Sequence, residues 1–368
     1  MVERKRTVLR LISGVALLVA TGIAAFYLSD LMSGVIKIEF LRAILGANVL
    51  VAILLGMLLG NLVLERIKGA VEFLAPGLEL YNLFLKLGII LLGARIIFSD
   101  LAHLGAIGLG IVVIKISFSI FFVIFLARLF RLPEKLSLLL AGGIGVCGVT
   151  AIMGTSEVTG ASREDTSYAI ATILLFGTVA IIVYPFIGWL LKMSATSFGV
   201  WAGLAIENTP QVVAAGAIYD HIVTGTLSGS AKVVATITKM CRNALVGFVI
   251  LGFALYYTRK GLAKGVKHKG RFLWRKFPKF VLGFILFAVL ASLGVFGPPQ
   301  SLVLRSFAFA ERWAFLFTFA GVGLATRFKD MAHIGYKPLV VGILAEVIVS
   351  ALTLLGVLLL GKLLTFST

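Results

Sequence analysis

Apolar runs long enough to cross a bilayer recur along the whole chain and alternate with short polar connections. A membrane-spanning helix needs about 20 mostly apolar residues. Runs of this kind lie near residues 8–28, 41–62, 82–98, 105–128, 136–158, 166–191, 197–219, 229–257, 278–297, 308–326 and 338–364. The pattern predicts an all-α polytopic membrane protein with about 10–11 transmembrane helices.

The composition agrees with lipid as the solvent. Hydrophobic residues make up 60% of the chain and charged residues 14%, and the mean hydropathy is +1.08, whereas soluble domains carry about 25% charged residues. The net charge of +18 does not indicate nucleic-acid binding, because the basic residues gather in the connections between apolar runs.

Three basic connections fix an expected orientation: Met1–Arg10, Arg128–Lys135 and Thr258–Phe280. If the spans alternate, all three fall on one side, which the positive-inside rule makes the cytoplasm. We therefore expect a multi-pass protein of the cytoplasmic membrane with a cytoplasmic N-terminus and no cleaved signal peptide. A homo-oligomer is compatible with the pattern.

An internal repeat links two distant parts of the chain. Gly93–Gly105 (GARIIFSDLAHLG) and Gly323–Gly335 (GLATRFKDMAHIG) share Phe-x-Asp-x-Ala-His in one register. By the charge pattern, the two copies run in opposite directions, as in the inverted-topology repeats of many secondary transporters. The prediction is one transporter-like domain, 1–368, with repeat copies at approximately 41–128 and 271–358.

Two apolar segments, Ala141–Gly160 and Ala202–Asp220, are rich in residues that weaken helices. Glycine costs about 1 kcal/mol and proline about 3 kcal/mol in a helix interior, and irregular backbone at membrane depth needs a protein-lined setting. We predict discontinuous helices or re-entrant hairpins that meet near the midplane, within broken-helix pairs 136–192 and 197–257. Ordinary glycine-rich packing helices are the alternative, and the pattern does not decide between spanning and re-entry.

A basic stripe follows the second of these segments. Lys232, Lys239 and Arg242 share one helical face with Thr236, and such a face inside a membrane could attract an anion. In the alternative interpretation Arg242 extends to the interface and Lys239 pairs with Glu207.

Four further charged residues stand inside apolar runs. Glu157 and Glu207 each lie in a broken segment and are candidates for ion coupling; the alternative is capping of a half-helix N-terminus. Lys115 and Glu346 occupy nearly equivalent positions in the two repeat copies, which predicts a structural ion pair.

Half-helix N-termini present unpaired N–H groups and partial positive charge, which suits an oxyanion. The predicted substrate-binding residues are therefore those of the broken segments and the basic stripe: Gly143, Gly145, Cys147, Gly148, Thr150, Asn208, Thr209, Gln211, Lys232, Thr236, Lys239 and Arg242. The sequence holds no zinc-protease motif, phosphate-binding loop or nucleophile–base spacing. We expect no enzyme, no cofactor and no bound metal.

Several motifs in combination resemble the UPF0324 membrane family, a family of proposed sulfate exporters. These are Gly143–Gly148 (GIGVCG), Ser162–Asp165 (SRED), Phe176–Thr178 (FGT), Gln211–Gly216 (QVVAAG) and Lys337–Leu339 (KPL). The chain departs from the family where a His-Asp or His-Glu pair is usual, because Glu207 and Asn208 stand there. A histidine proton relay is therefore not carried over, and Glu207 would have to supply any coupled proton.

Residues and resemblance together predict a secondary transporter that exports a small, sulfate-like anion by alternating access. The alternative is a sodium- or proton-coupled cation antiporter or symporter of similar inverted-repeat fold, working through Glu157 and Glu207. The expected partners are the anion, a proton or sodium ion and the lipid bilayer, with no nucleic acid.

Overall fold

The computed structural model describes residues 2–35, 48–67, 69–94, 98–225, 229–260, 268–298, 301–327 and 336–360. Over these ranges all regular structure is helical, and eight helices are long and apolar enough to cross a membrane. The prediction of an all-α polytopic membrane protein is confirmed. The chain divides into two compact units, which are described one at a time.

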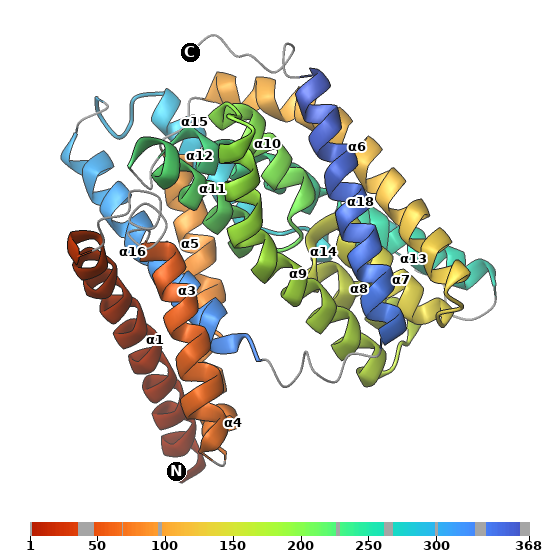
Figure 1. Ribbon diagram of the computed structural model, residues 1–368, viewed down its shortest axis with the longest axis horizontal. Coiled ribbons are helices and arrows are strands. Elements are labelled where there is room, and N and C mark those ends of the chain that lie inside the picture. The colour runs from red at the N-terminus through yellow and green to blue at the C-terminus, as the bar shows by residue number, and fades with distance from the viewer. Residues whose placement is uncertain are drawn as a thin grey trace. The chain divides into compact units, whose positions relative to one another are not determined.

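Unit 1 comprises Met1–Asp100, Asp220–Gly229 and Phe280–Lys329. Its helices are α1 (Val2–Val35), α3 (Asn48–Leu58), α4 (Ala70–Leu78), α5 (Tyr81–Gly93), α15 (Phe280–Ser292) and α16 (Leu302–Ala325), with a short π-helical and 3₁₀ continuation of α3 over Leu59–Val63 and Leu64–Arg66. Figure 1 draws α1 beside α3 and α4.

Small residues bring the helices of unit 1 into close contact. A Cβ atom on Gly56 of α3 would lie 2.6 Å from the carbonyl oxygen of Ala320 in α16, and one on Gly77 of α4 would lie 2.6 Å from Cα of Gly14 in α1. Backbone approach of this kind is typical of membrane helices, where packing rather than water exclusion drives association.

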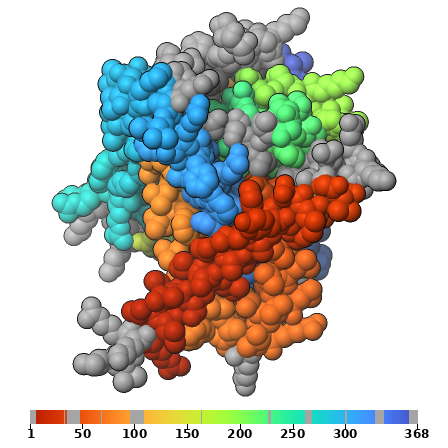
Figure 2. All heavy atoms as spheres, turned by 90° about the vertical axis from the view of Figure 1, so that its left-hand side faces the viewer, coloured from red at the N-terminus to blue at the C-terminus, as the bar shows by residue number. Residues whose placement is uncertain are grey.

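The outer side of α1 is apolar. Leu9, Ile12, Tyr27 and Leu31 are all exposed, and in Figure 2 α1 runs diagonally across this face of unit 1. An exposed apolar helix of this length suits contact with lipid chains.

Unit 2 comprises Leu101–Tyr219, Ser230–Lys279 and Asp330–Thr368. Its helices are α6 (Phe98–Leu129), α7 (Glu134–Gly142), the π-helical η3 (Gly143–Cys147), α8 (Val149–Thr159), α9 (Arg163–Leu190), α10 (Ala195–Ala205), α11 (Thr209–Thr224), α12 (Ser230–Ala244), α13 (Val246–Arg259), α14 (Lys269–Lys276) and α18 (Tyr336–Leu360). Both segments predicted to be broken lie here.

The first broken segment, α7–η3–α8, folds back on itself, and we call it hairpin 1. The ammonium of Lys135 at its start donates to the carbonyl of Gly160 at its end, at 2.7 Å. Deeper in, a Cβ on Gly142 would lie 3.0 Å from the hydroxyl of Thr155. A helix continuing straight would separate these residues by about 20 Å or more, so the segment re-enters rather than spans.

The second broken segment, α10–α11, also folds back, and we call it hairpin 2. The ring of Tyr219 in α11 stacks on that of Phe198 in α10 with centroids 3.9 Å apart. The Tyr219 hydroxyl also donates to the carbonyl of Met193, just before α10. Gly199 and Gly203 on α10 pack directly against α12.

The two hairpins open at opposite ends of α9. Hairpin 1 closes at Gly160, directly before α9, and hairpin 2 starts at Ala195, directly after it. The 28 residues of α9 span about 42 Å at 1.5 Å per residue, and Figure 1 shows α7 and α8 toward one end of it and α10 and α11 toward the other. The hairpins therefore enter unit 2 from opposite sides.

The predicted internal repeat stays a prediction. The second copy of its motif, Phe328–Gly335, lies outside the described residues, as do the side chains of Asp100 and His103 in the first copy.

Candidate functional site

The tips of the hairpins are set by two local breaks in the helices. Gly148 has φ +61° and ψ −124°, a backbone conformation that essentially only glycine adopts. In hairpin 2 the backbone is extended at Ile206, and α11 then starts at Thr209 with Pro210 in its first turn, where a missing N–H costs nothing. The side-chain oxygen of Asn208 accepts from the N–H of Val149 at 3.4 Å. The two tips are thus in contact.

Arg242 of α12 binds both tips at once. Its Nη1 donates to the carbonyls of Gly203, Leu204 and Ile206 at 3.0, 2.6 and 3.0 Å. Its Nη2 donates to those of Ile144 and Gly145 at 3.2 and 3.4 Å. The side chain is fully buried. A planar guanidinium with five donors suits this multiple role better than an ammonium would.

Lys239, one helical turn earlier on α12, repeats the arrangement. Its ammonium donates to the carbonyl of Val146 in hairpin 1 at 3.2 Å and to that of Ile206 in hairpin 2 at 3.0 Å, and also to the carbonyl of Glu207. The side chain is fully buried as well.

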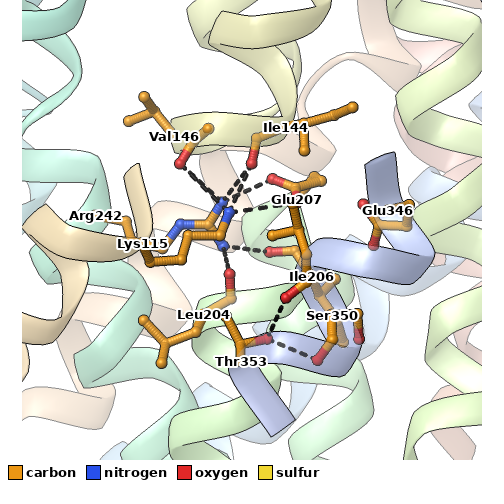
Figure 3. Close-up of polar contacts among 12 residues, drawn as sticks. Lys115, Ile144, Val146, Leu204, Ile206, Glu207, Arg242, Glu346, Ser350 and Thr353 are labelled. Carbon is orange, nitrogen blue, oxygen red and sulfur yellow. Dashed lines mark hydrogen bonds and ion pairs between the residues drawn. The ribbon is translucent and has the colours of Figure 1, made fainter. Parts of the chain in front are cut away.

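Lys115 of α6 completes the set of cations. Its ammonium donates to the carbonyl of Ile144 at 2.7 Å and lies 3.7 Å from Oε1 of Glu207. Glu207 is fully buried, and its Oε2 accepts from Nη2 of Arg242 at 2.7 Å. We call Lys115, Glu207, Lys239, Arg242 and Glu346 the tip cluster. Figure 3 labels Lys115, Glu207, Arg242 and Glu346.

These contacts correct the sequence-based pairing. Lys115 makes its ion pair with Glu207 and not with Glu346, whose Oε1 accepts from the Tyr184 hydroxyl at 3.1 Å. Arg242 does not extend to an interface, and it is Arg242 rather than Lys239 that forms the ion pair with the Glu207 carboxylate.

Glu157, the other residue predicted for ion coupling, lies far from the tips. It lies in the last turn of α8, its side chain is 58% exposed, and it pairs with Lys276 at 2.6 Å. Nine residues separate it from Gly148, or about 13 Å of helix.

The remaining predicted residues have varied roles. Cys147 ends η3 and is buried, whereas Thr150 is exposed. Added Cβ atoms on Gly143 and Gly145 would each lie 3.0 Å from an isoleucine, Ile152 and Ile120 respectively. These two glycines serve close packing.

On the side of hairpin 2, Thr209 accepts from the amide of Asn243 at 3.1 Å, and Gln211 donates to the carbonyl of Leu174 at 3.3 Å. The hydroxyl of Thr236 donates to the carbonyl of Lys232 at 2.8 Å, within α12. Lys232 is buried where Gly216 of α11 crosses α12, two turns from Lys239.

Sequence reasoning missed the aromatic residues beside Glu346. Tyr184 stacks on Trp201 with centroids 4.6 Å apart, and Nε1 of Trp201 donates to the carbonyl of Ser350 at 3.1 Å. Tryptophan and tyrosine usually find a polar partner when buried, which is the signal that could have pointed to them.

The charges at the tips are unequal in number. Three cations face two carboxylates, and the cations cover the carbonyl ends of η3 and α10, where helix dipoles are negative. The N-termini of α8 and α11, which are positive ends, meet at the tips, where the N–H of Val149 donates to the side chain of Asn208. The tips therefore carry an excess of positive charge.

The chain has relatives in several bacteria. It is 33% identical over 353 residues to the UPF0324 inner membrane protein YeiH of Escherichia coli K12, covering 93% of this chain and 92% of that one. It is 31% identical over 314 residues to a UPF0324 membrane protein of Nitratidesulfovibrio vulgaris, covering 84% and 83%. A family model described as "Conserved hypothetical protein 698" matches residues 13–342. The chain belongs to the UPF0324 membrane protein family.

No solved structure matches the chain. The matches to the relatives and to the family model extend over most of it, and they confirm the family that the sequence motifs indicated.

Proposed function

We propose that this family member is a secondary transporter that moves a small oxyanion of the sulfate type by alternating access. The observation that carries the proposal is the excess of buried cations where two oppositely entering hairpins meet. A buried cation is costly unless it is paired. Lys115 and Arg242 share one ion-paired carboxylate, Glu207, while Lys239 donates to backbone carbonyls, so that an anion would balance the remaining charge.

The hairpins supply a route for alternating access. Hairpin 1 separates the tip cluster from one end of unit 2, and hairpin 2 separates it from the other. Withdrawing one tip would open the cluster to that end alone, while the other hairpin keeps the far end closed. Discontinuous helices at the substrate site are a recurring device of secondary transporters.

The orientation follows from the basic connections. Arg128–Lys135, Lys260 and Lys276 lie at the end where hairpin 1 opens. The helix α6 ends there, Lys260 pairs with Glu134, and Lys276 pairs with Glu157. By the positive-inside rule this is the cytoplasmic end, and hairpin 2 opens outward. The relative in Escherichia coli is named an inner membrane protein, which supports a cytoplasmic-membrane location; the cytoplasmic N-terminus rests on the positive-inside rule alone.

The charge balance favours an anion carrier over the cation-coupled alternative. A sodium or proton antiporter based on Glu157 and Glu207 would need acids exposed to the ion path. Glu207 is held by Arg242 and Lys115, and Glu157 pairs with Lys276.

Sulfate counterflow tests the proposal. The full chain in proteoliposomes preloaded with sulfate should take up labelled sulfate faster than empty vesicles do, with saturation. Sulfite, bicarbonate, carboxylates and sodium salts serve as competitors. If none of the anions stimulates sulfate uptake, and the vesicles show sodium-dependent proton movement, the proposal is contradicted and the cation carrier is favoured.

A second measurement tests whether the anion binds at the tips. In Cys241→Ser, Cys147 is the single thiol of the chain, and a bound anion should slow its alkylation by a membrane-permeant maleimide. Lys135→Cys in a Cys147→Ser, Cys241→Ser background is the matched control, because position 135 lies at the open end of hairpin 1, away from its tip. Its alkylation rate should not respond to the anion.

A further inference from the structure

Glu346 differs from the other acid of the tip cluster in its contacts. It lies on α18, is 7% exposed, and among the described residues has no cation within ion-pair distance. One oxygen, Oε1, accepts from the Tyr184 hydroxyl, and the other, Oε2, is buried without a hydrogen-bond partner. Figure 3 shows its carboxyl group to one side of the group formed by Lys115, Arg242 and Glu207.

A buried carboxylate with one hydrogen bond and no contacting cation is strongly unfavourable. The same carboxyl with a proton on Oε2 carries no charge and keeps the hydrogen bond from Tyr184. The arrangement is therefore suited to a group that holds a proton while Lys115 is engaged with Glu207.

The charged groups around Glu346 link it to the anion site. Glu346 interacts electrostatically with Lys115 on α6, Glu207 on hairpin 2 and Arg242 on α12. It also accepts a hydrogen bond from Tyr184 on α9. From α10, Trp201 stacks on Tyr184 and does not titrate. A new negative charge at the tips would draw on the same cations and favour the protonated form of Glu346.

Glu346 is also connected mechanically to hairpin 2. Tyr184, its hydrogen-bond donor, stacks on Trp201 of α10. Trp201 in turn donates to the carbonyl of Ser350, one turn beyond Glu346 on α18. A displacement of α10 would therefore alter the surroundings of the carboxyl group.

We propose that Glu346 is a proton-binding site coupled to the anion site at the hairpin tips, so that proton and anion bind together. This inference rests on the proposed function for its anion partner. The step is the addition of one proton from water to the Glu346 carboxylate, giving the carboxylic acid. By linkage, anion binding promotes protonation as much as protonation promotes anion binding.

The first experiment needs no anion transport and tests the proton directly. Infrared difference spectra of the full chain in lipid, recorded across pH, should contain the C=O band of a buried protonated carboxyl. Glu346→Gln should remove this band, whereas Glu157→Gln, at an exposed carboxylate, should keep it. Tyr184→Phe retains the ring and removes the hydrogen bond, and should shift the band. A band unchanged in both Glu346→Gln and Tyr184→Phe would overturn the inference, even if the protein transports sulfate.

The second experiment tests the coupling. Sulfate binding measured calorimetrically in buffers of different ionisation enthalpy should show net proton uptake by the wild type, up to about one proton per sulfate. Glu346→Gln mimics the neutral acid, so it should bind sulfate with uptake lost and with little dependence of affinity on pH. Undiminished proton uptake in Glu346→Gln would contradict the coupling. If no anion binds to the wild type, the proposed function fails, and the infrared result still decides whether Glu346 holds a proton.

Discussion

The side-chain oxygen of Asn208 lies 3.4 Å from the backbone nitrogen of Val149, and so joins the tip of hairpin 2 to the first residue of α8 in hairpin 1. The contact requires Gly148 beside it, because a Cβ at that position would lie only 2.5 Å from the same oxygen. One residue without a side chain thus lets two hairpins from opposite sides meet.

We therefore expect Gly148→Ala to destabilise the protein and abolish sulfate binding. An L-residue at φ +61° and ψ −124° costs about 1–3 kcal/mol, and the methyl group also displaces Asn208. Thermal unfolding in detergent and sulfate titration measure the two effects. Gly160→Ala is the control, since Gly160 also has positive φ but has open space around it. It should lower stability modestly and leave binding intact; equal loss of binding in both variants would contradict this role for Gly148.

The ion pair between Arg242 and Glu207 should be strongly coupled. Arg242→Met leaves the buried Glu207 carboxylate with Lys115 alone and removes a donor from the carbonyls of both tips, and breaking a buried pair costs about 3–5 kcal/mol. Adding Glu207→Gln removes the charge of this carboxylate, so the double variant should be more stable than Arg242→Met alone. Unfolding of the two single variants and the double variant gives the coupling. Strict additivity would mean that the two side chains do not act as a pair.

The sides from which the hairpins enter predict which introduced cysteines are labelled from the same side of a vesicle. In a Cys147→Ser, Cys241→Ser background, Lys135→Cys and Gly160→Cys should both be labelled by an impermeant maleimide from the same side of a vesicle. Ser194→Cys, just before hairpin 2, should be labelled from the opposite side. If α7–η3–α8 spanned the membrane, the cysteines at 135 and 160 would react from opposite sides.

The sequence predicted the helices and the places where they break, because both depend on local residue properties. Apolar length defines a span, and glycine and proline weaken a helix wherever they stand. Re-entry was not predictable, since a hairpin and a full span place the next basic connection of this chain on the same side. Only contacts between distant residues, such as Lys135 with Gly160, decide it.

The pairing of the buried charges was out of reach for a similar reason. Spacing along a helix gives the face of Lys239 and Arg242 but not which of them reaches Glu207, since both project from neighbouring turns of α12. Lys115 and Glu346 matched in the repeat alignment, yet Glu207 competes for the lysine from a segment with no counterpart in that alignment. For Glu157, in contrast, the helical rise alone places the residue about 13 Å from the break.

An exposed ion pair at the open end of hairpin 1 should make a small, pH-dependent contribution to stability. Glu134 lies 2.8 Å from Lys260 after α13, and the hydrogen bond from this ammonium holds the pKa of Glu134 below its ordinary value of 4.5. Because the folded-state pKa is lowered, the stabilisation is present at neutral pH and is lost as the pH falls through the folded pKa. Glu134→Gln should lower the Tm slightly at pH 7 and not at all in strong acid. Lys260→Gln should give the same profile, and a deficit that persists in acid would assign the effect to packing. High salt should shrink the difference, as it does for exposed pairs.

The decisive variant for the anion is Lys239→Met, which keeps the apolar stem and removes the charge. Lys239 donates to carbonyls of both tips, so its loss should weaken sulfate binding by about 1.5–3 kcal/mol, the range for hydrogen bonds to charged groups. Lys232→Met is the matched control, because it makes the same replacement two turns earlier on α12, outside the tip cluster. Titrations at several pH values should show weakened affinity in Lys239→Met, near-normal affinity in Lys232→Met, and altered pH dependence in Glu207→Gln. Unchanged sulfate affinity in Lys239→Met, combined with loss of ion coupling in Glu207→Gln, would reject the anion site and support a cation carrier that uses Glu207.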